Sequence, residues 1–258
     1  MTSLHCVQEG RGPIVVLSHA LGSNLGMWDA VVAILKDRFT LFRYDHRNHG
    51  KSEQFQTPFT IDDMADDAAS LILEVAAGKK VHFAGLSMGG MVAQSLAARH
   101  PQLLSSVVIA NSAEYYDDSA KKNWTTRIES VNANGIRPIA EAIISRWFTP
   151  EFIRTQKGSA NDLVEESKID LEDCDPLAYA LSCNAVANID FRIPNTLINM
   201  PTLIIAGIQD QATPVALSQS IHRNIKNSEL IEINAAHLSA IEKPIEFANA
   251  LQYFYIKS

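Results

Sequence analysis

The sequence has no long hydrophobic run, few cysteines and no cluster of basic residues. No stretch approaches the roughly 18 consecutive apolar residues of a membrane-spanning helix, and the first residues, Met1 to Cys6, lack the basic and apolar regions of a secretory signal peptide. We therefore expect a soluble, cytoplasmic protein that does not bind membranes. The three cysteines, Cys6, Cys174 and Cys183, are odd in number and lie at no metal-ligand spacing, so we expect free thiols and no metal site.

The charge of the chain also narrows the range of partners. The 22 Lys and Arg residues and 29 Asp and Glu residues give a net charge of -7. An acidic balance without a basic cluster argues against nucleic acid and anionic membranes as partners. An anionic substrate would need cations gathered locally in its pocket. No pattern in the sequence requires a cofactor.

Short β-rich runs alternate with helical patterns along most of the 258 residues. Their continuous apolar character is typical of strands covered on both faces, as in a parallel sheet with crossover helices. The expected strands are Ile14 to Leu17, Leu41 to Tyr44, Val81 to Ala84, Val107 to Ala110, Leu203 to Ala206 and Leu230 to Ile233. The chain is therefore predicted to have an α/β fold with a mostly parallel central sheet flanked by helices.

This alternation stops between the fourth and fifth expected strands. Apolar residues from Trp124 to Phe148 recur there at helical spacings, and four prolines, Pro138, Pro150, Pro176 and Pro194, divide the segment into short helices. We expect residues 113–199 to form a helical cap inserted into a core made of residues 1–112 and 200–258. No flexible linker joins the two parts, so the cap is expected to pack on the core.

Ser87 lies in the segment Gly85-Leu86-Ser87-Met88-Gly89, where an apolar run meets a G-x-S-x-G motif and then a helical pattern. The motif alone would also fit a glycine-rich turn, but a strand before it and a helix after it are typical of a nucleophile elbow. In such a sharp turn the two glycines let the strand and the helix pass closely. The serine hydroxyl is then exposed at the start of a helix, whose amides favour negative charge.

Two further polar residues follow expected strands. Asp210 comes after the strand that ends near Ala206, and His237 comes after the strand that ends near Ile233. The carboxyl ends of parallel strands meet at one edge of a sheet, and the order Ser, Asp, His is that of α/β-hydrolases. We predict a catalytic triad in which His237 removes the proton of Ser87 and Asp210 orients and stabilises the imidazole.

An oxyanion formed by attack on a carbonyl needs two hydrogen-bond donors. The first expected donor is the backbone amide of Met88, directly after the nucleophile. The second is the amide of Leu21, in the loop that follows the first expected strand.

Other polar residues have simpler interpretations. His19, His46 and His49 lie in loops and are expected to bond to the backbone rather than act as acid or base. Asp45 precedes the nucleophile, and we expect it to form an ion pair with Arg47 that braces their loop. The acidic run from Asp62 to Asp67 is expected to be the solvated start of a helix, where the helix dipole favours it.

The sequence resembles the 3-oxoadipate enol-lactonases of the α/β-hydrolase superfamily over nearly its whole length. The matching segments are Leu21-Gly22, Met27-Trp28-Asp29, Arg43-Tyr44-Asp45, Gly85 to Gly90, Trp124 to Ile128, Arg146 to Pro150 and Ala235 to Ser239. The elbow and histidine segments occur in many hydrolases, whereas the two cap segments are much more specific to this family. Two positions depart from the pattern: His19-Ala20 replaces Asn-Ser near the oxyanion loop, and Asn48 replaces a glycine, which is expected to alter only loop geometry.

The resemblance implies hydrolysis of 3-oxoadipate enol-lactone to 3-oxoadipate, in the degradation of aromatic compounds. The substrate would be a small anionic lactone, and Arg127, Arg146 and the indole N–H of Trp147 are the candidates to bind its carboxylate; ordinary cap packing is the alternative for each. A broader carboxylesterase, a carbon–carbon bond hydrolase and a slow-turnover receptor would use the same fold, and fold alone does not separate them.

Overall fold

A computed structural model describes residues 2–257 and contains a seven-stranded sheet in the order β1-β3-β2-β4-β5-β6-β7. Every neighbouring pair is parallel except β1 and β3. The strands are β1 (Cys6–Gly10), β2 (Ile14–Ser18), β3 (Thr40–Tyr44), β4 (Val81–Leu86), β5 (Leu104–Ala110), β6 (Thr202–Gly207) and β7 (Ser228–Ile233). The predicted mostly parallel α/β fold is confirmed.

The sequence did not predict β1, the antiparallel edge strand. This strand, Cys-Val-Gln-Glu-Gly, is partly exposed along its length, whereas β4 and β6 are buried throughout. An edge strand that faces solvent lacks the continuous apolar run by which the central strands were recognised.

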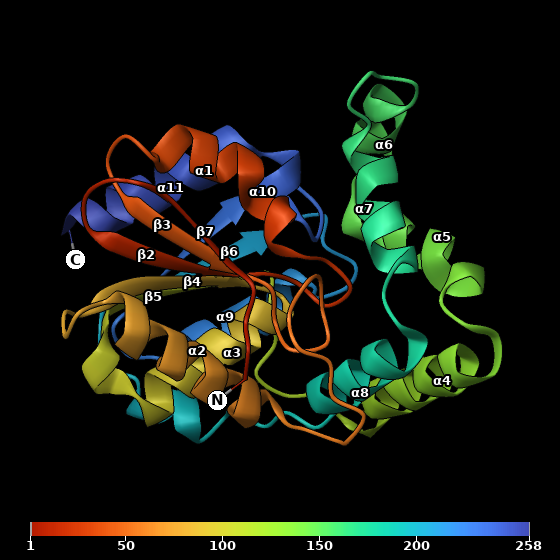
Figure 1. The fold of residues 1–258 in the computed structure, drawn as a ribbon, viewed down its shortest axis with the longest axis horizontal. Coiled ribbons are helices and arrows are strands. Elements are labelled where there is room, and N and C mark those ends of the chain that lie inside the picture. The colour runs from red at the N-terminus through yellow and green to blue at the C-terminus, as the bar shows by residue number, and fades with distance from the viewer. Residues whose placement is uncertain (1, 258) are drawn as a thin grey trace.

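Helices cover both faces of the sheet (Figure 1). One layer contains α1 (Asp29–Leu35), α10 (Ser239–Glu242) and α11 (Pro244–Lys257), and the other contains α2 (Ile61–Val75), α3 (Met88–Arg99) and α9 (Val215–Asn224). Three short 3-10 turns complete the core: η1 (Leu25–Trp28), η2 (Pro101–Leu103) and η3 (Pro194–Leu197). The core is therefore a three-layer sandwich whose buried strands are sealed from water on both sides.

Five helices lie between β5 and β6, in the segment that we call the cap. They are α4 (Asp118–Asn134), α5 (Arg137–Trp147), α6 (Pro150–Gln156), α7 (Leu163–Glu172) and α8 (Pro176–Ala187). Helix α4 packs along α8, and α5 packs on α7. The prolines predicted to divide the segment lie in the first turns of α5, α6, α8 and η3, where the missing N–H costs no hydrogen bond.

The cap lies beyond the carboxyl ends of the parallel strands (Figure 1). Its two ends meet in a short antiparallel bridge between Tyr115 and Asp190. None of the described helices is both long and apolar enough to cross a membrane. The three cysteines are free thiols.

Candidate active site

Ser87 occupies a sharp turn between β4 and α3, with the unusual backbone angles φ 59° and ψ -114°. A Cβ atom at Gly85 would lie 1.9 Å from the carbonyl oxygen of Gly89, and one at Gly89 would lie 2.2 Å from that of Ser18. Only glycine fits at these two positions. The Ser87 amide donates to the Ala110 carbonyl over 2.9 Å, which ties the turn to β5.

The structure brings Ser87, His237 and Asp210 together. The Nε2 atom of His237 lies 2.9 Å from Ser87 Oγ, and its Nδ1 atom lies 2.8 Å from Asp210 Oδ2. All three are buried, with exposed fractions of 9% for Ser87, 3% for His237 and 5% for Asp210. An Nδ1–H that donates to the carboxylate leaves the Nε2 lone pair free to accept the serine proton. This geometry suits activation of the hydroxyl as a nucleophile.

Asp210 is surrounded by hydrogen-bond donors. Burial opposes its ionisation, but the His237 ring and hydrogen bonds from His237, Asn111 and Thr213 outweigh that effect and hold the pKa of Asp210 below its usual value. The Asn111 amide donates over 2.9 Å and the Thr213 hydroxyl over 2.8 Å, while the amides of Ala212 and Thr213 donate to the other carboxylate oxygen. The aspartate is therefore kept ionised and fixed in place.

Asn111 and Thr213 were missed by the sequence analysis. Asn111 directly follows β5, so its position at the carboxyl end of a central strand was an available signal. Its backbone has φ 44°, and its side-chain oxygen accepts from the hydroxyl of Ser239 over 2.6 Å. Thr213 carried no comparable signal, because its contact with Asp210 depends on the turn after β6.

The two expected oxyanion donors line the same cavity as Ser87. Met88 is the first residue of α3, and the first amides of a helix have no partner within it. Within residues 2–257, neither the Met88 amide nor the Leu21 amide has a hydrogen-bond acceptor in the protein. Both amides are thus available to a ligand, as an oxyanion hole requires.

Three buried histidines, His19, His46 and His49, pack in and against the oxyanion loop, the segment after β2 that contains Leu21. Nε2 of His49 accepts from the Gly22 amide over 3.1 Å, and Nε2 of His19 accepts from the His46 amide over 2.9 Å. The remaining ring nitrogens of His49 and His19 lie against the carbonyls of Arg47 and Ala20. Each of these two rings must be neutral to accept one bond and donate the other.

The third ring, His46, places Nε2 within 2.9 Å of Ser18 Oγ. As expected, the rings of His19 and His49 bond to the backbone, whereas the ring of His46 contacts a side-chain hydroxyl instead. Burial lowers the pKa of His19 to about 3 and that of His49 to about 4, and it lowers the pKa of His46 well below the usual range.

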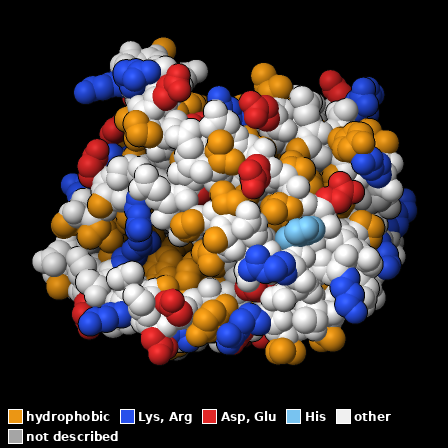
Figure 2. Space-filling model, turned by 180° about the vertical axis from the view of Figure 1, so that it is seen from behind, with side chains coloured by type: hydrophobic (Ala, Val, Ile, Leu, Met, Phe, Trp, Pro, Cys, Tyr) orange, Lys and Arg blue, Asp and Glu red, His pale blue; other side chains and the backbone are white. Residues whose placement is uncertain are grey.

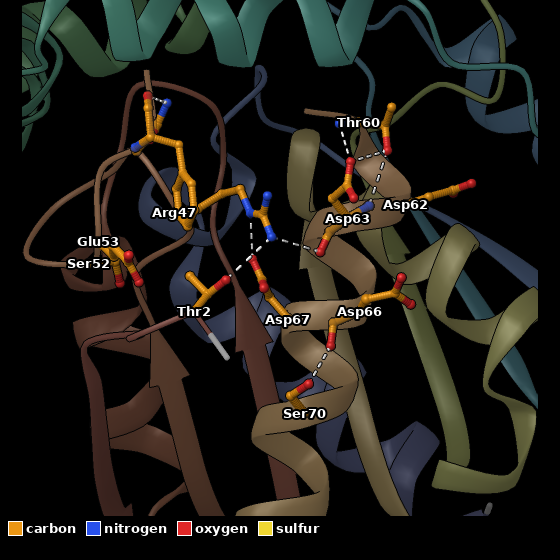
Figure 3. Close-up of polar contacts among 12 residues, drawn as sticks. Thr2, Arg47, Ser52, Glu53, Thr60, Asp62, Asp63, Asp66, Asp67 and Ser70 are labelled. Atoms are coloured by element: carbon orange, nitrogen blue, oxygen red, sulfur yellow. Dashed lines mark hydrogen bonds and ion pairs between the residues drawn. The ribbon is translucent and has the colours of Figure 1, made fainter. Parts of the chain in front are cut away.

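The predicted ion pair between Asp45 and Arg47 is wrong. Asp45 instead accepts from the amides of Leu25 and Lys51 and contacts His5, so its oxygens are occupied. Arg47 turns away toward α2 and pairs with Asp67, 2.6 Å from its Nε (Figure 3). Its guanidinium also lies over the rings of Phe55 and Phe59.

The acidic run at the start of α2 is only partly solvated. Thr60 and Asp63 form a capping box around the helix N-terminus (Figure 3). Asp66 pairs with Arg99 and His100, whereas Asp67 is buried against Arg47. The run therefore connects the helix to neighbouring elements as well as facing water.

Asn48 adopts φ 64°, a left-handed conformation that glycine reaches most easily. Its side chain stabilises the turn by accepting from the Phe55 amide over 2.6 Å and donating to the Phe55 carbonyl over 3.1 Å. It also reaches the carbonyl of Ala178 in α8, 3.5 Å away. The replacement of glycine thus adds a contact with the cap beyond the expected change in loop geometry.

A cavity of about 140 Å³ opens on Ser87 and is lined mainly by the cap. Its cap residues include Trp124, Arg127, Ile143, Arg146, Trp147 and Tyr179. Figure 2 shows the molecule hollowed on the cap side, with a largely hydrophobic lining and basic side chains beside it. An apolar pocket with a few polar groups is the usual form of a small-molecule site.

Arg127 and Arg146 reach this cavity without acidic partners. The Arg127 guanidinium lies over the ring of Trp124, 4.6 Å from its centroid. In the part of the chain that the structure describes, neither arginine forms an ion pair. Trp147 is buried and lines the same cavity, and its carbonyl accepts from the Leu238 amide, next to His237. The structure therefore gathers all three expected substrate-binding residues at the cavity.

Nowhere in residues 2–257 do three or more His, Cys, Asp or Glu side chains form a group able to hold a metal ion.

Comparisons with known proteins agree with this architecture. The profile of the alpha/beta hydrolase fold matches residues 13–244. The chain is 34% identical over 240 residues to 3-oxoadipate enol-lactonase 2 of Acinetobacter baylyi, covering 93% of this chain and 87% of that one, and 33% identical to 3-oxoadipate enol-lactonase 1 of the same bacterium, covering 95% and 89%.

Among solved structures, the enol-lactonase from Burkholderia xenovorans LB400 superimposes with a TM-score of 0.92 at 30% identity, covering 99% of this chain and 97% of that one. The chain is thus similar to these relatives in sequence and in fold over nearly its whole length. It belongs to the α/β-hydrolase fold family and, within it, to the family of the 3-oxoadipate enol-lactonases.

Proposed function

We propose that this hydrolase opens 3-oxoadipate enol-lactone to 3-oxoadipate through a serine acyl-enzyme, in the degradation of aromatic compounds. The observation that carries the proposal is the presence of two unpaired arginines, Arg127 and Arg146, in the cavity that contains Ser87. Arg127 is half-buried, and a partly desolvated charge without a counter-ion is costly. A substrate that carries a carboxylate in addition to its reacting carbonyl would supply that counter-ion.

The geometry supports a two-stage mechanism. Ser87 Oγ attacks the lactone carbonyl while His237 Nε2, 2.9 Å away, takes its proton. The oxyanion accepts hydrogen bonds from the Met88 and Leu21 amides. Collapse breaks the ring C–O bond, and the enolate that leaves takes the proton from His237. An enolate is a better leaving group than a simple alkoxide.

The ring-opened acyl chain then stays attached to Ser87 as an ester. Water, activated by His237, attacks this ester and releases the diacid, and the proton returns to Ser87. Asp210 stabilises the imidazolium in both stages, since its carboxylate is held ionised 2.8 Å from Nδ1. No step requires a group other than these side chains, the two amides and water.

The cap is proposed to bind the carboxylate that lies outside the lactone ring. Arg127 is the more enclosed of the two arginines and stacks on Trp124, which holds its guanidinium in the cavity. Arg146 is more exposed, and the Trp147 indole can offer a further N–H. The acidic chain and its free thiols suit a cytoplasmic enzyme that acts on a small anionic lactone and binds neither membranes nor nucleic acid.

Depletion of purified enol-lactone, compared with hydrolysis of its methyl ester and of aryl acetates, tests the proposal. The charged lactone should show the highest kcat/KM, and loss of its carboxylate should lower kcat/KM by about 1.5–3 kcal/mol, the worth of a charge-assisted hydrogen bond. Equal rates on charged and neutral esters would indicate a general carboxylesterase. Cleavage of a vinylogous diketone in preference to the lactone would indicate a carbon–carbon hydrolase, and a single turnover would indicate a receptor.

A further inference from the structure

We propose that Glu242 is a positioning residue that holds the catalytic histidine in register with the cap. The inference rests on the proposed serine mechanism but not on the identity of the substrate. Glu242 ends α10, touches neither Ser87 nor the cavity, and has an exposed fraction of only 7%. A buried carboxylate is retained only where donors satisfy it.

The donors to Glu242 come from two places far apart in the sequence. Its Oε2 atom accepts from the Ala236 amide over 3.1 Å and from the Thr149 amide over 3.2 Å, and its Oε1 atom accepts from the Thr149 hydroxyl. Ala236 precedes His237, whereas Thr149 follows α5 of the cap. The carboxylate therefore joins the histidine loop to the cap by three hydrogen bonds.

A second bond ties the other side of the histidine to the same cap segment. The Leu238 amide donates to the Trp147 carbonyl over 3.0 Å. The amides on both sides of His237 are thus fixed, directly or through Glu242, to residues 147–149. These bonds set the position of the His237 backbone. The ring can then reach Ser87 and Asp210 at the same time.

The same cap segment also approaches the oxyanion loop. A Cβ atom at Gly22 would lie 3.7 Å from the ring of Trp147 and 2.6 Å from the side chain of Leu171. Trp147 therefore bonds to the histidine loop through its carbonyl and lines the same cavity as Leu21 of the oxyanion loop. A displacement of about 1 Å at the histidine can cost about 100-fold in rate. Loss of the Glu242 carboxylate should therefore lower kcat.

Glu242→Gln is the direct test, since it keeps the shape but places an amide group among three donors. A matched control is Glu114→Gln: Glu114 is also buried, with an exposed fraction of 3%, and its carboxylate also accepts from protein donors, those of Asn195, Ser220 and Asn224. On 4-nitrophenyl acetate, we expect Glu242→Gln to lower kcat about 10- to 100-fold with KM changed less than about 3-fold. Glu114→Gln should keep kcat within about 3-fold of native while lowering Tm to a similar extent.

Thr149 supplies a second pair of variants in case Glu242→Gln does not fold. Thr149→Val removes the hydroxyl at constant shape, whereas Thr149→Ser keeps it and should restore most of kcat. The double variant Glu242→Gln with Thr149→Val should be no slower than Glu242→Gln alone, because the two residues act through one bridge.

The proton NMR signal of the His237 Nδ1–H provides a readout that does not depend on turnover. It should shift or broaden in Glu242→Gln and Thr149→Val and stay in place in Glu114→Gln and Thr149→Ser. Native kcat and an unmoved signal in folded Glu242→Gln, or an equal loss of kcat in Glu114→Gln, would overturn the proposal. Activity that survives in Ser87→Ala would instead refute the serine mechanism, whereas the NMR comparison would still show whether Glu242 positions the His237 ring.

Discussion

The two sides of the cavity differ in how their polar groups are satisfied. On the core side, Asp210 and His237 already have partners within the protein, and each is fixed by several hydrogen bonds. On the cap side, Arg127 and Arg146 have no acidic partner among the described residues. The core is thus prepared before substrate arrives, whereas the cap leaves its charges free for a ligand.

This difference suggests a division of labour. Groups that must react are costly to reorganise during catalysis, so fixed dipoles and hydrogen bonds around them lower the barrier. Groups that must recognise an anion are useful only while unpaired. We infer that the core supplies chemistry that any accessible ester could undergo, and that the cap selects the substrate that carries a carboxylate.

The largest effect should come from breaking the core side at Ser87. Ser87→Ala removes one hydroxyl from the elbow, and loss of a nucleophile of this type lowers kcat by about 10⁶. The fall should be the same for lactone and aryl acetate, and Tm should stay near native because no core volume is lost. A variant that kept more than about a tenth of native kcat/KM, equivalent to about 1.4 kcal/mol of lost transition-state stabilisation, would rule out the serine nucleophile.

Asp210→Asn should give the next largest effect. The amide keeps the shape of the side chain but favours the wrong imidazole tautomer and does not stabilise the imidazolium, so kcat should fall by about 10⁴ with a much smaller change in KM. Asp45→Asn is the control, since Asp45 bonds to Leu25, Lys51 and His5 rather than to His237. The reverse pattern in steady-state kinetics would identify Asp45 as the catalytic acid.

Acid should damage the core side through its buried histidines. In the folded protein burial lowers the pKa of His19 to about 3 and that of His49 to about 4, whereas the unfolded value is about 6.5. Below pH of about 6.5 the unfolded chain binds protons that the folded one does not, so the free energy of unfolding falls as pH falls toward 4. Each histidine contributes up to about 1.4 kcal/mol per pH unit.

Urea denaturation at several pH values between 7.5 and 4.5 measures this slope. His49→Gln should flatten it by about one proton, since glutamine can still accept from Gly22 and donate to Arg47 but does not titrate. An unfolding free energy that is constant from pH 7 to pH 5 would show that the rings of His19 and His49 do not need to be neutral.

Much of the fold could be predicted because its central strands are continuous apolar runs, each buried on both faces. The same reasoning failed for β1, which has only two apolar residues, Cys6 and Val7, and is partly exposed along its length. Ser87, Asp210 and His237 could be placed together because each follows a strand of a parallel sheet. Their catalytic roles remain predictions, although their side chains lie within hydrogen-bond distance.

The residues that hold this site in place were harder to predict. Glu242 meets Thr149 across 93 residues of sequence, and Asn111 meets Asp210 across 99. Such contacts form only when distant segments of the chain meet in the fold, and no local pattern encodes the contact of Glu242. The pairing of Arg47 with Asp67 rather than Asp45 has the same origin, because Asp45 is already occupied by backbone amides.

Paired kinetics of the cap variants test the division of labour most directly. Arg127→Met and Arg146→Met would be compared with native protein on the enol-lactone and on a neutral aryl acetate. We expect at least one variant to lose about 10- to 150-fold in kcat/KM on the lactone, the worth of a charge-assisted hydrogen bond, and less than about 3-fold on the acetate. Equal losses on both substrates, or no loss on the lactone in either variant, would contradict a cap that selects the charged substrate.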